Sequence, residues 1–304
     1  MPTHQHSHKH DHSHSHSHDG KLGLAVFINI LLTVAQIIGG ILSGSLSLIA
    51  DALHNLSDAG AILIALIARK IAAKPANKNM TYGYQRAEII GAFINSITLI
   101  LIGLYLIVEA ISTYFNPTEI NGWLVVWVAG IALIIDVTTA ILTYLSGSKD
   151  SMNIRAAFIH NISDALASVA VIISGVLIIL YQWYAVDLIA TMCISIYVIY
   201  HGLLLVKQSI NILMEAVPDH IAVEEIKSEI EKFAHIERAV DIHIFQLNEN
   251  ITCLEGKLIL SQRDHESPLG KIKDMLRINY SISHSTLEIL PSSSKDVHEC
   301  YEID

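Results

Sequence analysis

Two nearly identical hexapeptides, HNLSDA at residues 54–59 and HNISDA at residues 160–165, hold side chains that can bind a metal ion. In each, a histidine stands four residues before an aspartate, a spacing that puts both side chains on one face of an α-helix. Two such helices supply two imidazoles and two carboxylates, which zinc accepts in a tetrahedron. Imidazole ligands favour zinc over manganese or magnesium. The four predicted ligands are His54, Asp58, His160 and Asp164.

The charge of this set indicates what it exchanges. Two neutral imidazoles and two carboxylates carry a charge of −2, which one divalent ion neutralises. Without the metal, two carboxylates in apolar surroundings do not both stay charged and bare, so protons on the histidines or aspartates take its place. A site that trades Zn²⁺ for protons has the chemistry of an antiporter.

Both hexapeptides lie inside long apolar segments, where ionisable side chains are rare and usually functional. Simple packing is the alternative, since polar side chains also join helices through hydrogen bonds; it is our interpretation for the Asn and Ser residues between each His and Asp. Asp51 and Asp136 are predicted accessory residues. Asp136 is expected to act as an outer proton relay or to pair with a nearby hydroxyl, Thr138 or Thr139.

The elements that must position these residues are membrane helices. Of the 304 residues, 52% are hydrophobic and only 16% are charged, whereas a soluble protein carries about a quarter charged residues. A membrane-spanning helix needs about 20 apolar residues, and six segments have that length. They are residues 22–43, 46–68, 87–113, 121–145, 153–181 and 185–208.

The connections between these segments predict their orientation. The link 69–86 carries five Lys or Arg residues and the link 146–152 carries Lys149 close to Arg155, whereas the other three links carry none. Positive residues favour the cytoplasmic side. We therefore expect six transmembrane helices with both termini in the cytoplasm. The two hexapeptide-bearing segments then run antiparallel, a pattern typical of inverted repeats with the site between the halves.

The C-terminal part, residues 211–304, has the composition of a soluble acidic domain, with 18 Asp or Glu against 9 Lys or Arg. Its periodicity predicts a helix at 219–233, strands at 240–247 and 252–260, a helix at 267–278 and a strand at 284–290. This αββαβ order is compatible with a ferredoxin-like α+β fold. The acidic balance argues against nucleic acid as a partner. The predicted domains are thus 1–20, the six-helix domain 21–210, and 211–304.

The first twenty residues alternate histidine with other polar residues and cannot form a core, so we expect a disordered cytoplasmic tail. It is interpreted as an accessory that gathers zinc, with an expression tag as the alternative. Its histidines are His4, His6, His8, His10, His12, His14, His16 and His18.

Four separated stretches resemble the cation diffusion facilitator family, specifically its zinc-exporting branch. They read SGSLSLIADALHNLSDA at 43–59, YGYQRAEIIGAFIN at 82–95, FIHNISDALASV at 158–169 and ILMEAVP at 212–218. The resemblance implies a homodimeric transporter that exports Zn²⁺ from the cytoplasm in exchange for protons, often tolerating Cd²⁺. It also implies that the four hexapeptide residues are the transport ligands.

The resemblance is weaker in the C-terminal domain. His243 and His284 match strand positions where relatives bind zinc, but Val240 and Lys257 stand where relatives often carry histidine. A structural or regulatory Zn²⁺ site with His243 and His284, with help from His298 or Cys300, is one interpretation; polar surface residues on a dimerisation domain are the other. Without a long His-rich loop between the fourth and fifth spans, the chain favours a bacterial inner (plasma) membrane, surrounded by lipid.

Two other functions are alternatives to transport. An intramembrane zinc peptidase needs a catalytic constellation such as HExxH, and this sequence contains no HExxH. We therefore expect that the protein is not an enzyme. A metal sensor without flux stays open, and only a transport measurement separates it from an exporter.

Overall fold

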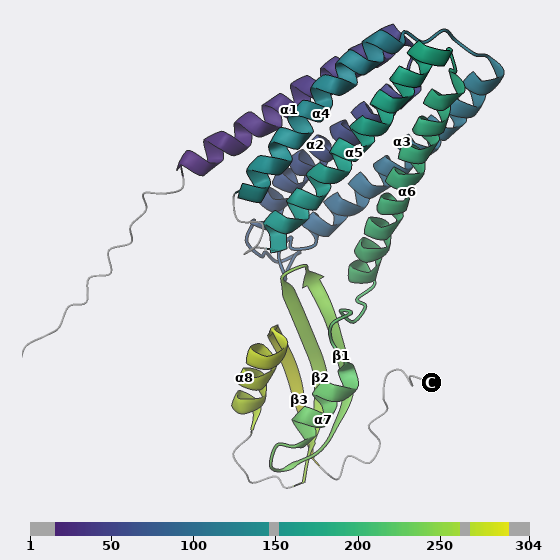
Figure 1. Cartoon of the computed structure of the whole chain (residues 1–304). Coiled ribbons are helices and arrows are strands. Elements are labelled where there is room, and N and C mark those ends of the chain that lie inside the picture. The colour runs from purple at the N-terminus through teal and green to yellow at the C-terminus, as the bar shows by residue number, and fades with distance from the viewer. Residues whose placement is uncertain (1–15, 146–151, 262–267, 292–304) are drawn as a thin grey trace, which may run out of the picture. The chain divides into compact units, whose positions relative to one another are not determined.

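The structure is a computed structural model that describes residues 16–145, 152–261 and 268–291. Six long helices come first in the chain, in the segments that hydropathy predicts (Figure 1). Their bounds are α1 His16–Ser43, α2 Leu46–Ala72, α3 Ala87–Phe115, α4 Gly122–Leu145, α5 Met152–Tyr181 and α6 Ala185–Leu213.

Five of these helices, α2 to α6, are long and apolar enough to cross a membrane. In α1, the part whose side chains are described gives only the shorter apolar stretch Ile30–Ser43. The first span, the total of six and the orientation therefore stay predictions. So do the domain boundaries after residues 20 and 210, although α1 begins at His16, before the predicted residue 22.

The outer surface of the helices is apolar. Large hydrophobic side chains such as Leu66, Trp127 and Leu180 are 59%, 68% and 64% exposed, and most of the exposed hydrophobic residues belong to the six helices. In water such a surface would drive aggregation, whereas in a bilayer it contacts lipid tails. The helical part therefore has the surface of a membrane domain.

Two compact units make up the chain: residues up to 62 with 98–202, and residues 63–97 with 203–304. The first unit contains the hexapeptides. Within it, α4 and α5 pack closely because glycines face each other. A Cβ atom on Gly122 would lie only 2.8 Å from the carbonyl oxygen of Gly175, so small residues permit this approach. The core of the unit consists of Leu48, Ala50, Leu99, Leu106, Ile120, Val125, Ala129, Val171, Ile178, Ile194 and Val198.

Asp187 of α6 holds the start of α2. Its buried carboxylate accepts hydrogen bonds from the backbone N–H groups of Leu46 (2.8 Å) and Ser47 (3.2 Å), and from the hydroxyls of Ser45 and Ser47 (both 2.6 Å). Asp187 stands in the first turn of its own helix α6, yet its carboxylate caps the start of α2 instead. The first N–H groups of α2 have no partner within their helix, and a carboxylate is favourable at that positive end.

The second unit contains a three-stranded sheet with two short helices, in the predicted αββαβ order. The strands lie in the order β1-β2-β3; β1 and β2 are antiparallel, and β2 and β3 are parallel. Ile226 and Ile230 of the first short helix share one core with Ile272 and Leu276 of the second. The bounds are α7 Val223–Glu231, β1 Ile236–Asn248, β2 Ile251–Leu260, α8 Leu269–Tyr280 and β3 Ile282–Pro291.

Candidate metal centre

The structure brings together the side chains of the two hexapeptides, one on α2 and the other on α5. The Nε2 atom of His54 lies 3.6 Å from Asp58 Oδ2 and 3.4 Å from Asp164 Oδ1. The Nε2 atom of His160 lies 3.4 Å from Asp58 Oδ2 and 3.5 Å from Asp164 Oδ2. Each histidine thus contacts the aspartate of its own helix and that of the other.

These separations fit a tetrahedral metal. With bonds of about 2.0–2.2 Å, the ligand atoms of a zinc tetrahedron are about 3.3–3.6 Å apart, and all four His–Asp separations lie between 3.4 and 3.6 Å. His54, Asp58 and Asp164 offer atoms that all lie within 4.8 Å of one another. His160 adds a fourth nitrogen, and its ring centre is 6.2 Å from that of His54.

Two carboxylate oxygens in this group lack an ordinary hydrogen bond. Within the described part of the chain, neither Asp58 Oδ2 nor Asp164 Oδ1 has a hydrogen-bond partner, although both atoms are buried. A buried acceptor without a donor is costly. A cation placed between the four side chains would satisfy both oxygens, so the arrangement suits a divalent ion.

A second group of polar side chains lies among α1, α2, α4 and α5. Gln36 Nε2 donates to Asp51 Oδ2 (2.7 Å), and Asn55 Nδ2 donates to Gln36 Oε1 (3.1 Å). The Ser168 hydroxyl lies 2.9 Å from Asp136 Oδ2 and 3.5 Å from Asp51 Oδ2. The predicted accessory residues Asp51 and Asp136 are therefore joined through a serine.

Gln36 and Ser168 are missed by the sequence reasoning. Gln36 interrupts the apolar run of α1, a signal that could have been used, whereas Ser168 resembles any small residue in a membrane helix. The predicted hydroxyl partners of Asp136, Thr138 and Thr139, donate to the carbonyl oxygens of Ile134 and Ile135. The contact of Asn55 with α1 agrees with its interpretation as a polar link between helices.

An aromatic side chain of α6 also approaches the centre. The ring of Tyr197 lies 6.3 Å from that of His54, edge to face, and 4.5 Å from that of His201. No motif or spacing in the sequence points to Tyr197. It forms part of the wall around His54.

The two histidines predicted for a cytoplasmic zinc site lie on different strands of the sheet. His243 on β1 lies 3.0 Å from Asp241, with which it shares a hydrogen bond, and pairs across the strands with Glu255. His284 on β3 pairs with Cys253, and its ring lies 6.2 Å from that of Tyr82. This site stays a prediction.

For the remaining predicted residues, the structure does not describe the side chains. His298 and Cys300 lie outside the described residues, as do the tail histidines from His4 to His14. His16 and His18 belong to the first turns of α1, where side chains are not described.

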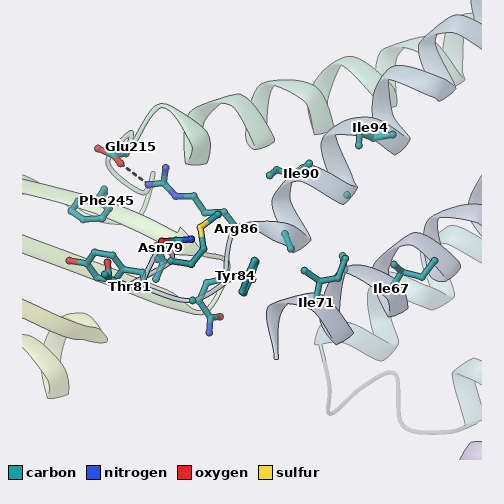
Figure 2. Close-up of a pocket in the computed structure, with 18 of the residues that line it drawn as sticks. Ile67, Ile71, Asn79, Thr81, Tyr84, Arg86, Ile90, Ile94, Glu215 and Phe245 are labelled. Carbon is teal, nitrogen blue, oxygen red and sulfur yellow. Dashed lines mark hydrogen bonds and ion pairs between the residues drawn. The ribbon is translucent and has the colours of Figure 1, made fainter. Parts of the chain in front are cut away.

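A large cavity of about 860 Å³ lies in the second unit, and none of the four His–Asp ligands lines it. Its walls come from the α2–α3 link, the adjoining turns of both helices and the sheet (Figure 2). At its edge Arg86 forms an ion pair of 2.6 Å with Glu215. Isoleucines such as Ile67 and Ile90 make it largely apolar, and the group of described residues that could hold a metal ion, His54, Asp58 and Asp164, lies outside it.

Comparison with known proteins agrees with a membrane transporter. The family model described as the cation efflux transmembrane domain matches residues 22–214, which includes both hexapeptides.

Three bacterial relatives resemble the chain over most of its length. The cadmium, cobalt and zinc/H(+)-K(+) antiporter of Bacillus subtilis (strain 168) is 36% identical over 84% of this chain and 84% of its own length. The zinc transporter ZitB of Pectobacterium atrosepticum is 32% identical, covering 91% and 87%. The metal cation efflux system protein CzcD of Cupriavidus metallidurans is 32% identical, covering 91% and 88%.

Proposed function

Because the chain belongs to the cation efflux family, the cation diffusion facilitators, in its zinc-exporting branch, we propose that it exports Zn²⁺ from the cytoplasm in exchange for protons. The metal passes through a shell of His54, Asp58, His160 and Asp164. The observation that carries this proposal is the set of His–Asp separations of 3.4–3.6 Å, which match the edges of a zinc tetrahedron.

Proton exchange follows from the charge of the shell. The two carboxylates need positive charge, and the described side chains of residues 30–62, 98–145 and 158–202 include no Lys or Arg. Zn²⁺ supplies that charge when bound, and protons on the imidazoles supply it otherwise. The metal and the protons therefore compete for one site, which is what antiport requires.

Family membership makes the chain a multi-pass membrane protein, not an enzyme; the intramembrane peptidase hypothesis is thereby set aside. We propose six spans in a bacterial inner membrane, with both termini and the acidic 211–304 domain in the cytoplasm. The five basic residues of the 69–86 link support that orientation. A homodimer and a regulatory zinc ion at His243 and His284 remain part of the proposal.

The cargo range follows from the ligands. Two imidazoles and two carboxylates suit zinc, with cadmium as a second cargo, and disfavour manganese. The names of the relatives support this range, since one is a zinc transporter and another a cadmium, cobalt and zinc antiporter.

Transport of ⁶⁵Zn²⁺ into proteoliposomes tests the site. We expect Asp58→Ala and Asp164→Ala each to abolish uptake, because each removes a ligand and leaves the shell with a charge of −1. Glu109→Gln, a carboxylate of α3 outside the shell, serves as the matched control and should transport normally. Undiminished uptake in both aspartate variants would refute the site.

The coupling ion needs its own experiment. Zinc flux should collapse when the pH gradient is dissipated and should respond little to a K⁺ gradient. Flux that ignores the pH gradient argues against proton antiport. Zinc binding without any flux would instead favour the sensor hypothesis.

A further inference from the structure

A second pair of buried carboxyl groups lies beside the metal centre. Asp51 is 1% exposed and Asp136 is 8% exposed. The hydroxyl of Ser168, fully buried, lies 2.9 Å from Asp136 Oδ2 and 3.5 Å from Asp51 Oδ2. A hydroxyl has a single proton to donate, so it cannot donate fully to two charged carboxylates at once.

The side chains around Asp51 leave one of its oxygens without a donor. Asn55 donates to the oxygen of Gln36, which turns the amide nitrogen of Gln36 towards Asp51 Oδ2. Asp51 Oδ1 is buried and has no hydrogen-bond partner among the described residues. A bare carboxylate oxygen in an apolar interior is unfavourable, whereas a protonated carboxyl is not.

The charges of the neighbouring groups sharpen this point. The ionisable side chains that act on Asp51 and Asp136, besides each other, are His54 on α2, and His160 and Asp164 on α5. From the described part of α1, the neutral Gln36 donates to Asp51. The shell and the second pair together hold four carboxyl groups, and the described side chains of residues 30–62, 98–145 and 158–202 include no Lys or Arg. Protons must therefore offset the charge of this joint set when no metal is bound.

We propose that Asp51, Ser168 and Asp136 form a proton-binding site that is distinct from the metal shell. It holds one proton while the shell is without metal and releases it when Zn²⁺ binds, because the metal adds positive charge to the joint set of four carboxyl groups. Ser168 donates its hydroxyl proton to Asp136 Oδ2, which leaves Asp51, whose Oδ1 has no donor among the described residues, as the group that carries the exchangeable proton. This inference rests on the proposed zinc–proton exchange.

The test counts the protons released per zinc bound. Zinc is titrated calorimetrically into the full-length protein in detergent, in buffers of different ionisation enthalpy. We expect the double variant Asp51→Asn/Asp136→Asn to bind as much zinc per chain as the wild type but to release about one proton fewer. Glu109→Gln is the matched control and should release the wild-type number.

Several results distinguish this inference from the proposed function. If the double variant releases as many protons as the wild type, the proton site is wrong, even though zinc still binds the shell. A wild-type proton count with lost K⁺ binding would overturn it as well, since the pair would then hold K⁺. Zinc binding that survives Asp58→Ala would refute the shell instead. If the double variant does not fold, Asp136→Asn alone must lower the pH dependence of zinc flux, and an unchanged profile overturns the proposal.

Discussion

Replacing Asp187 with alanine should loosen the start of α2, the helix that carries His54 and Asp58. The carboxylate of Asp187 accepts hydrogen bonds from two backbone N–H groups and from two serine hydroxyls of that start. All of these groups are buried or partly buried. Alanine removes every acceptor atom at once and leaves a space at the positive end of the helix.

The cost follows from the groups that lose their partner. The hydroxyls of Ser45 and Ser47 lie 3.2 Å apart and can bond each other, so they are largely compensated. The N–H groups of Leu46 and Ser47 are both donors, so they cannot replace the lost acceptor by bonding each other. A buried donor without an acceptor costs about 1–3 kcal/mol, so two of them cost about 2–6 kcal/mol of folding free energy.

Thermal stability in detergent, followed by fluorescence-detected size exclusion, measures this loss. Each kcal/mol lowers Tm by about 2–4 °C in domains of 150–250 residues, so we expect a fall of at least roughly 4 °C for Asp187→Ala. Asp187→Asn keeps one acceptor oxygen, so its Tm should lie between those of the wild type and Asp187→Ala. Glu109→Gln is the control. A change below roughly 2 °C would refute the capping role, and a loss of one bound zinc per chain without a change in Tm would make Asp187 a ligand instead.

Three further predictions concern single positions. Gly44 has φ of +73°, and a Cβ atom there would lie 3.0 Å from the carbonyl oxygen of Glu119, so Gly44→Ala should lower the free energy of unfolding by about 1–2 kcal/mol. The control Gly130→Ala, where a Cβ atom would meet nothing within 4 Å, should not lower Tm. Equal Tm changes in the two variants would contradict this prediction. His160→Asp replaces an imidazole with a third carboxylate, so zinc affinity should fall at least about tenfold relative to manganese; metal competition checks this, and an unchanged ratio opposes it. Burial raises the pKa of the Cys253 thiol above its ordinary value, which keeps the reactive thiolate scarce at neutral pH. Its alkylation at pH 8, followed by mass spectrometry, should be at least about tenfold slower in the folded protein than in denaturant, and equal rates would be incompatible with its burial.

The features that could be predicted from the sequence are local ones. Apolar length predicts where the helices lie, and the i to i+4 spacing of His54 and Asp58 follows from helix geometry alone. That α2 and α5 bring their pairs together is a tertiary fact. This contact could be expected only because each pair places a carboxylate in apolar surroundings, where its charge must be offset by the other pair's histidine or by a metal.

Contacts between distant helices could not be predicted in the same way. Asp187 stands in the first turn of α6, which suggests a local cap, yet its partners lie about 140 residues earlier in the chain. Strand β1 begins at Ile236 rather than at the expected residue 240. An irregularity in strand pairing between Val240 and His243, with Asp241 at φ of 54°, breaks the alternation on which the prediction depends.

The two hexapeptides are almost identical in sequence but not in environment, and this difference has a consequence for how the metal moves. The side chains of His54 and Asp164 are each 12% exposed, whereas those of Asp58 and His160 are 25% and 47% exposed. Each helix thus contributes one enclosed and one more exposed side chain to the proposed shell, and the exposed ones come from different helices. On the proposed function, a metal ion that reaches the shell from its exposed side meets His160 and Asp58 first, so a movement of α5 against α2 would change both the opening and the shell. Two copies of one motif on one helix could not do this, because their ligands would move together.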